Sequence, residues 1–167
     1  MKKIAILIEN MFNAEELLYP YHRLKEEYEV HLIGTEKNKE YHSEHGLLKK
    51  STHSSSEVLA KDYVGLIIPG GYSPDKMRAC EATKKLVRNF DQNNLPIGAI
   101  CHGPWMLCSC VDLSGVQVTS VVNIKDDLIN AGGKWKDQAV VVDKNYITSR
   151  TPKDLQSFIK AFLEALQ

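Results

Sequence analysis

The sequence lacks the features that define several large classes of protein. No apolar run approaches the ~20 residues that a membrane-spanning helix needs. Neither sign of charge is in excess, because 21 Lys and Arg residues balance 21 Asp and Glu residues in a chain of 167. Nucleic acids and acidic membranes are bound by basic surfaces, so we expect neither as a partner.

The amino terminus does not fit a secretion signal. Lys2 and Lys3 precede an apolar run, but that run covers only residues 4–8 and ends at Glu9 and Asn10. The apolar region of a signal peptide is longer and is not closed by an acidic residue. We therefore interpret this segment as a first core strand and expect a cytoplasmic protein.

Cysteine is scarce, and its positions match no common template. The four thiols, Cys80, Cys101, Cys108 and Cys110, show neither CxxC spacing nor the density of a disulfide-rich secreted domain. This usage predicts free thiols in a reducing compartment. Cys108 and Cys110 fall in an apolar helical pattern and are expected in the core, whereas Cys80 precedes a charged helix and is interpreted as incidental.

Metal-ligand spacing is also missing. His42, His45 and His53 lie with Glu44 in the polar segment 34–56, but their spacing fits no metal-binding template. We interpret this segment as a solvated excursion containing a small hairpin. No metal ion is assigned.

What the sequence does contain is a regular alternation of short apolar runs and amphipathic stretches, typical of a parallel sheet flanked by helices. The expected strands are 3–8, 28–33, 63–68, 96–100 and 116–120, with a late hairpin of 140–142 and 146–148. The expected helices are 15–27, 81–93, 104–111, 124–131 and 152–166. The pattern predicts one domain over residues 1–167, a three-layer α/β/α sandwich with a mostly parallel central sheet.

Two prolines give local expectations within these helices. Pro152 suits the first turn of the last helix, and Thr151 is expected to cap it. Pro20 falls inside the first helical pattern, where it predicts a kink or an irregular first turn.

The most informative motif is a nucleophile elbow at Cys101. The buried run 96–100 ends in small-x-Cys-x-Gly, with Ala99 and Gly103 as the small residues, and leads into a helical pattern. Such a tight turn displays the nucleophile above the sheet, where a helix dipole and free N–H groups favour a thiolate. An ordinary buried thiol is the alternative, but the spacing and the strand–helix context favour a reactive Cys101.

Candidate partners for Cys101 are its neighbour His102 and two residues, Gly71 and Glu16, that follow other expected strands. The His102 N–H and the Gly71 N–H are candidate oxyanion-hole donors, and the His102 imidazole is a candidate proton shuttle whose orientation the sequence leaves open. The alternative to an oxyanion-hole role for Gly71 is a purely structural role in a tight turn. Glu16 lies in the first turn of the first expected helix, where an acidic residue usually only complements the helix dipole. The alternative is that Glu16 is protonated and hydrogen-bonds the thiolate of Cys101.

With these residues placed, the chain resembles the PfpI family, the intracellular protease I-like branch of the ThiJ/PfpI superfamily. The resemblance extends over essentially the whole length. It is carried by residues 16–27, 69–78, 99–104, 124–132 and 148–155.

The resemblance implies a flavodoxin-like sandwich with Cys101 as nucleophile and Glu16 hydrogen-bonded to it. It also implies an oxyanion hole lined by Gly71 and His102, and a Cys–His–acid triad completed by Asp75 from a neighbouring subunit. The implied assembly is a homo-oligomer, a dimer or a hexamer, with sites at subunit interfaces. No cofactor is implied.

The chain departs from the family pattern at two places near the expected substrate. Asn13 stands where the loop after the first strand usually carries an acid. Residues 121–123 stand where an aromatic-Pro pair usually follows the equivalent of Ser120. Asp75 is also one methylene shorter than a glutamate.

Our leading hypothesis is a cytoplasmic cysteine-dependent, hydrolase-type enzyme. The resemblance implies action on small carbonyl compounds or modified protein side chains, as a protein deglycase or glyoxalase-like enzyme, or action as an intracellular peptidase or amidase. One alternative is a redox or stress-response sensor or chaperone whose Cys101 is oxidised without turnover. Another is a non-catalytic oligomeric binding module.

Overall fold

Strands and helices alternate along the chain much as the sequence predicts. The strands are β1 (Lys3–Leu7), β2 (Glu29–Gly34), β3 (Glu40–His42), β4 (Leu48–Lys50), β5 (His53–Ser54), β6 (Gly65–Ile68), β7 (Ile97–Ile100), β8 (Gln117–Val118), β9 (Lys134–Trp135), β10 (Val140–Asp143) and β11 (Tyr146–Ser149). The α-helices are α1 (Ala14–Leu24), α2 (Ser73–Met77), α3 (Glu81–Gln92), α4 (Trp105–Cys110), α5 (Lys125–Asn130) and α6 (Leu155–Ala165).

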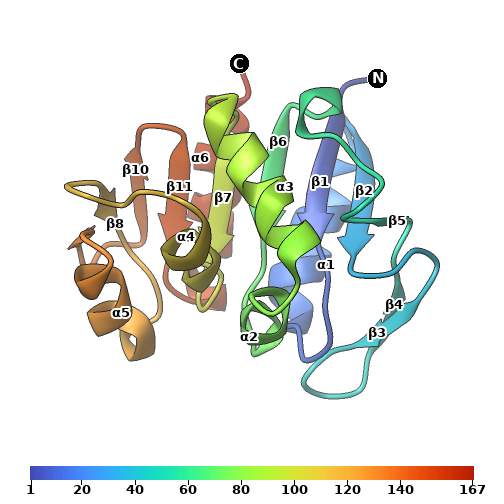
Figure 1. Cartoon of the computed structure of the whole chain (residues 1–167), viewed down its shortest axis with the longest axis horizontal. Helices are drawn as coiled ribbons and strands as arrows, with labels where there is room; N and C mark the ends of the chain where they lie inside the picture. Colours follow the sequence, from blue (N-terminus) through green and yellow to red (C-terminus); the bar gives the residue numbers. More distant parts are fainter.

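A seven-stranded sheet forms the middle layer of the computed structural model, which describes residues 1–167 (Figure 1). The strand order is β10-β11-β7-β6-β1-β2-β5, and every neighbouring pair is parallel except β10–β11. The expected α/β/α sandwich with a mostly parallel sheet is therefore confirmed. The chain reverses its direction of progress across the sheet between β1 and β6, so the carboxyl ends of these strands border the crevice where ligands bind in such folds.

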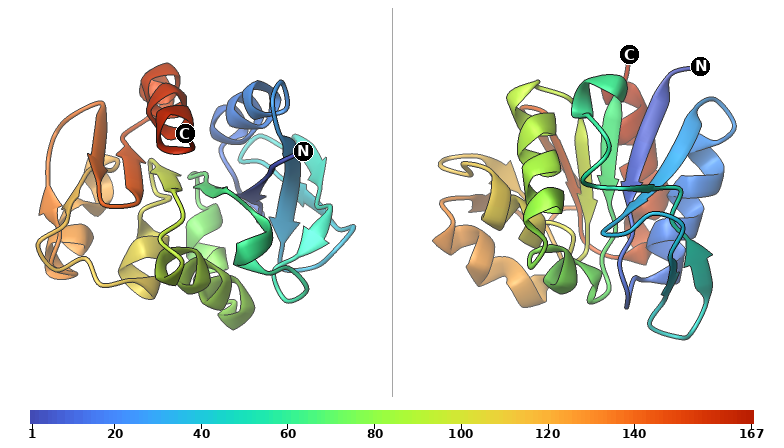
Figure 2. Two further views of the ribbon diagram at one scale, coloured as in Figure 1. Left: turned by 90° about the horizontal axis from the view of Figure 1, so that it is seen from above. Right: turned by 45° about the vertical axis from the view of Figure 1, so that its right-hand side comes forward.

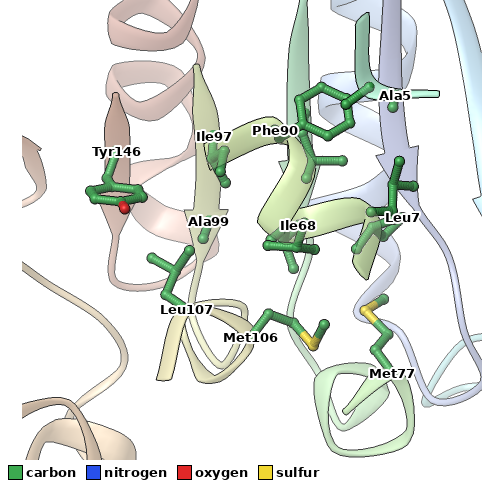
Figure 3. Packing of buried hydrophobic residues seen from close by; sticks show 14 of the residues in the cluster. Ala5, Leu7, Ile68, Met77, Phe90, Ile97, Ala99, Met106, Leu107 and Tyr146 are labelled. Carbon is green, nitrogen blue, oxygen red and sulfur yellow. The ribbon is translucent and has the colours of Figure 1, made fainter. Parts of the chain in front are cut away.

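Helices cover both faces of the sheet, and each face has its own core. Seen from above, α1 and α6 lie on one side of the sheet and α3 and α4 on the other (Figure 2). Beneath α3 and α4, Phe90, Met106 and Leu107 pack on Leu7 and Ile68 (Figure 3). The opposite core is formed by β-strand residues with residues of α1 and α6, among them Leu17, Phe158 and Phe162. Burial on both faces explains why the central strands show no polar alternation.

Several element ends differ from the sequence prediction. The first helix ends at Leu24 rather than residue 27, and it continues without a break through Pro20. The expected strand 116–120 is reduced to β8, which pairs with β9 in a separate two-stranded sheet. The cap expected from Thr151 is wrong: its side chain makes no capping hydrogen bond, and a 3₁₀ turn over Pro152–Asp154 precedes α6.

The segment 34–56 is more ordered than a solvated excursion. Its expected hairpin is present, since β3 and β4 pair antiparallel. However, the aromatic ring of Tyr41 and the side chain of Ser43 are buried. The sequence did not predict the burial of these two residues, because most of their neighbours are polar and exposed.

No helix of the structure combines the length and the apolar content needed to cross a membrane.

Gly98 provides a test of how tightly β7 packs against α6. A Cβ at this position would lie 2.8 Å from Ile67 Cδ1 and 3.0 Å from ring carbons of Phe158 and Phe162. We expect Gly98→Val to lower the free energy of unfolding by about 1–3 kcal/mol, because the rings must move. Urea denaturation measures the change, with the exposed Val142→Thr on β10 as control. Equal losses in the two variants would contradict this packing.

Candidate active site

The structure forms the expected elbow at Cys101. Cys101 follows β7 directly and has a φ of 62°, a left-handed backbone conformation that residues other than glycine rarely adopt. Its N–H donates to the Ser149 carbonyl at 3.1 Å, and its carbonyl accepts from the Val121 N–H at 3.1 Å. These two backbone bonds hold the strained residue between neighbouring segments.

The residue two positions after the nucleophile must be small, as predicted. A Cβ on Gly103 would lie 2.4 Å from the Ile68 carbonyl oxygen and 2.8 Å from that of Ile100. The backbone after β7 therefore turns against the end of β6 with no room for a side chain. This contact sets how far Cys101 stands from the β6 turn.

His102 lies with its imidazole toward the sulfur. The distance from Cys101 Sγ to His102 Nδ1 is 3.4 Å, within hydrogen-bond range for sulfur. The ring centroids of Trp105 and Tyr72 lie 5.2 and 5.9 Å from that of the imidazole. Burial lowers the pKa of His102, which favours the neutral form that can accept a proton.

Gly71 and His102 present backbone N–H groups to the same sulfur. Neither N–H donates to a backbone carbonyl, and both act on Cys101 Sγ so as to lower the pKa of the thiol, against the larger effect of burial. Gly71 has a φ of 68°, which a glycine tolerates readily. The two predicted oxyanion-hole donors are thus brought together at one atom.

Glu16 is a fully buried carboxyl in the first turn of α1. Its Oε2 accepts a 2.7 Å hydrogen bond from the Gly70 N–H, while Oε1 has no oxygen or nitrogen partner. Burial raises the pKa of Glu16 to about 8, with smaller opposing contributions from the Gly70 N–H and from Cys101. At neutral pH the group is therefore mainly protonated and can donate a hydrogen bond, as the role inferred from the family resemblance requires.

The thiol itself is less acidic than the sequence predicts. Burial raises the pKa of Cys101, and the Glu16 carboxylate, when charged, raises it further; the N–H groups of His102 and Gly71 act in the opposite direction. The helix α4 begins at Trp105 and has six residues, and the effect of its dipole on the thiol stays a prediction. A nearby base such as His102 is therefore needed to remove the proton.

Asp75 does not contribute to the site within one chain. It is exposed in the first turn of α2 and makes no ion pair or side-chain hydrogen bond. The predicted role of Asp75 concerns a neighbouring subunit, so it stays a prediction.

The other cysteines lie outside the site. Cys108 and Cys110, on α4, are half-buried at the edge of the core rather than inside it as expected, and burial raises the pKa of both to about 11. Cys80 is the N-cap residue of α3. Although burial works against it, the nearby polar groups of Thr83 and Ser55 lower the pKa of Cys80. No catalytic partner accompanies it.

Two residues at the site were missed as functional in the sequence. Asn13, noted only as a departure from the family pattern, caps α1: its side chain accepts from the Glu16 N–H at 3.1 Å. A cap three residues before Glu16 is a recognisable spacing. Glu44, interpreted as part of a solvated loop, is half-buried beside Gly71: its Oε1 lies 2.7 Å from the position a Cβ on Gly71 would take. No spacing of residues near Glu44 in the sequence predicts its contact with Gly71.

A hollow of about 320 Å³ lies near the segment that holds the Cys101 carbonyl, and its lining includes Ser120, Val121, Trp135 and Lys153. None of the predicted catalytic residues lines it. Val121 is one of the positions at which the chain departs from the family pattern, and its N–H holds the Cys101 carbonyl. The larger hollow, of about 710 Å³, runs along α1 and includes none of the predicted catalytic residues. No group of three or more His, Cys, Asp or Glu side chains is placed to hold a metal ion.

Comparison with known proteins gives concordant matches over the whole chain. The family model described as the DJ-1/PfpI family matches residues 2–165. The chain is 40% identical over 166 residues to "Deglycase PfpI" of Pyrococcus furiosus and 41% identical over 167 residues to "Putative cysteine protease YraA" of Bacillus subtilis, covering 99% of this chain and of each relative. A solved two-domain protein of Anabaena variabilis, with DJ-1/ThiJ/PfpI-like and ferritin-like domains, superposes with a TM-score of 0.97 at 38% identity, over 99% of this chain and 48% of that one.

The raised pKa of Glu16 predicts a specific loss of stability with rising pH. The folded pKa of about 8 exceeds the ordinary value of 4.5, so the folded state binds this proton more tightly. The resulting stabilisation is complete below pH 4.5 and is lost as the pH rises to about 8, with a slope of at most about 1.4 kcal/mol per pH unit.

Glu16→Gln removes this dependence while keeping an acceptor for the Gly70 N–H. We expect the free energy of unfolding of the wild type, minus that of the variant, to decline between pH 5 and 8 in urea titrations. Parallel pH profiles for the two proteins would show that Glu16 is not titrating in this range.

Proposed function

Because the chain belongs to the DJ-1/PfpI family, we propose that it is a cysteine-dependent enzyme that removes 2-oxoaldehyde adducts from protein side chains or related amines and thiols. The observation that carries the proposal is the convergence at one sulfur of a base and two N–H donors: His102 Nδ1 at 3.4 Å and the amides of Gly71 and His102. This arrangement suits a nucleophile that generates an oxyanion.

The first step transfers the thiol proton of Cys101 to His102 Nδ1. Sγ then forms a bond to the carbinol carbon of the adduct, and the bond from that carbon to the side-chain nitrogen, or to the sulfur of a thiol adduct, breaks. The proton held by His102 goes to the leaving nitrogen or sulfur, which restores the free amine or thiol and the neutral imidazole. While the sulfur of Cys101 is a thiolate anion, the protonated Glu16 donates a hydrogen bond toward it.

The remaining steps release the two-carbonyl fragment as an acid. A proton moves from the sulfur-bearing carbon to the neighbouring carbonyl carbon, which gives a thioester of a 2-hydroxy acid. Water hydrolyses this thioester and returns the thiol. One carbon is oxidised while its neighbour is reduced, so the reaction consumes only water and needs no external oxidant. The Gly71 and His102 amides face the oxyanions that arise on the way.

Adduct removal suits the site better than cleavage of long peptides. None of the hollows in the structure is lined by Cys101, so no extended groove that would hold a long peptide runs past the thiol. A small adduct needs no such groove.

We expect Cys101→Ser to lower kcat/KM for methylglyoxal and for a methylglyoxal-modified peptide by roughly 10³-fold or more, because a hydroxyl replaces the nucleophilic sulfur. Lactate release and recovery of the free amine measure the two reactions. Cys108→Ser, a second half-buried thiol on the following helix, is the matched control.

Equal rates for the wild type and Cys101→Ser would refute the proposal. Sulfinic-acid formation at Cys101 under mild peroxide, without turnover of either substrate, would favour the alternative role as a redox sensor.

The proposed enzyme is a homo-oligomer in which Asp75 of one subunit orients His102 of another. The exposed position of Asp75 on α2 leaves its carboxylate free for such a contact. A partly apolar hollow along α1, lined in part by Leu18, Tyr19 and Leu155, offers a surface for a second copy.

Asp75→Asn is expected to lower kcat/KM by about 10- to 100-fold, while the rate of Cys101 alkylation changes little, because the loss concerns imidazole orientation. Sedimentation of the wild type should show a dimer or a larger assembly. A strictly monomeric, fully active protein would exclude Asp75 from the site.

A further inference from the structure

Glu44 is a half-buried carboxylate at the edge of the active site that has no partner. Its side chain takes part in no ion pair and no hydrogen bond. Its Oε1 nevertheless occupies the space beside Gly71, 2.7 Å from where a Cβ would stand. Burying an unpaired charge even in part costs free energy, unless a ligand neutralises the charge.

The backbone that carries Glu44 is tied to the same segment as Gly71. The Glu44 N–H donates to the Phe12 carbonyl at 3.0 Å, and Phe12 forms isolated β-bridges with both Ser43 and Gly71. Ser43 Oγ accepts from the N–H groups of His45 and Leu47, which fixes the turn that follows. Glu44 is therefore held at a defined distance from the Gly71 amide.

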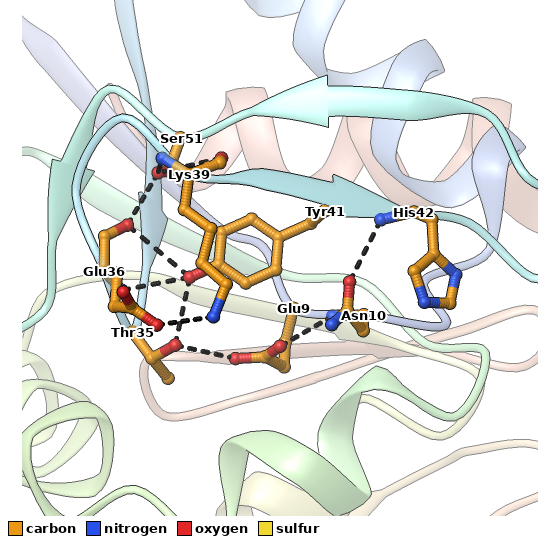
Figure 4. Close-up of polar contacts among 8 residues, drawn as sticks. All are labelled: Glu9, Asn10, Thr35, Glu36, Lys39, Tyr41, His42 and Ser51. Atoms are coloured by element: carbon orange, nitrogen blue, oxygen red, sulfur yellow. Dashed lines mark hydrogen bonds and ion pairs between the residues drawn. The ribbon is translucent and has the colours of Figure 1, made fainter.

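The hairpin as a whole is anchored to the carboxyl ends of β1 and β2. The Tyr41 hydroxyl lies 3.0 Å from Thr35 Oγ1 and accepts from the Glu36 N–H, while Thr35 donates to Glu9 (Figure 4). Asn10 accepts from the His42 N–H at 3.1 Å. This network of polar contacts gives the hairpin a single position on the sheet.

Glu44 acts on the catalytic groups through space and not by contact. No Glu44 oxygen lies within 4.0 Å of a His102 nitrogen, yet its charge raises the pKa of His102 against the effect of burial and raises that of Glu16. Glu44 thus makes no direct contact with His102 that a bound cation would have to displace.

We propose that Glu44 binds the cationic end of the substrate, so that the enzyme prefers adducts of arginine guanidinium groups to adducts of thiols. The inference rests on the proposed function and adds the substrate class to it. A 2-oxoaldehyde adduct of a guanidinium group keeps its positive charge, whereas a thiol adduct is neutral. A carboxylate recognises a guanidinium group by charge-assisted, bidentate hydrogen bonds.

The test compares two methylglyoxal adducts, those of N-acetyl-arginine amide and N-acetyl-cysteine amide. In Glu44→Gln, the ratio of kcat/KM for the arginine adduct to that for the cysteine adduct should fall about tenfold, mainly through KM, as for a half-buried ion pair. Glu40→Gln, on the same hairpin but exposed, is the matched control and should keep the wild-type ratio.

An equal loss on both adducts, or an unchanged ratio, would overturn the assignment of Glu44 to substrate binding. A binding measurement separates this from failure of the proposed function. NMR titration of unmodified N-acetyl-arginine amide into Cys101→Ser should give a Kd that rises about tenfold when Glu44→Gln is added. If the wild type turns over neither adduct but this difference is observed, the cation site stands and the proposed reaction fails. If the Kd does not change, the cation site fails.

Discussion

The site depends on one steric constraint, the absence of a side chain at Gly70. A Cβ there would lie 2.6 Å from Glu16 Oε2, 2.9 Å from Cys101 Cβ and 2.9 Å from the backbone nitrogen of His102. The carboxyl, the nucleophile and an oxyanion donor therefore converge on the space that a single methyl group would fill. The strained φ of Cys101 and the tight packing of Gly103 are tolerated because the surrounding backbone fixes both strand ends.

Two carboxyl groups near the thiol differ because their surroundings differ. Glu16 has no exposed surface, so burial holds its proton into the neutral range and makes it a donor. Glu44 lies half-exposed at the edge and has no partner within the chain. One carboxyl thus faces the sulfur and the other is available to a ligand, and burial is the main difference between them.

The elbow was predictable from the sequence because its signals are local. Ala99, Cys101 and Gly103 lie within five residues, and a buried strand precedes them. The alternation of strands and helices likewise predicted the confirmed sandwich. Features that depend on long-range contacts were not predictable: Glu44 reaches Gly71 through a hairpin, and the burial that raises the pKa of Cys101 comes from several elements. Thr151 failed as a cap because a 3₁₀ turn intervenes before α6.

The hairpin of β3 and β4 belongs to the connection between β2 and β5, and none of the strands that hold Cys101 or the glycine turn forms part of it. The side chain at position 44 makes no hydrogen bond or ion pair, so it can change without altering the backbone that holds the sulfur. Evolution could exchange the group at position 44 and so redirect one reactive centre to new substrates, while selection on the elbow and on Gly70 continued unchanged.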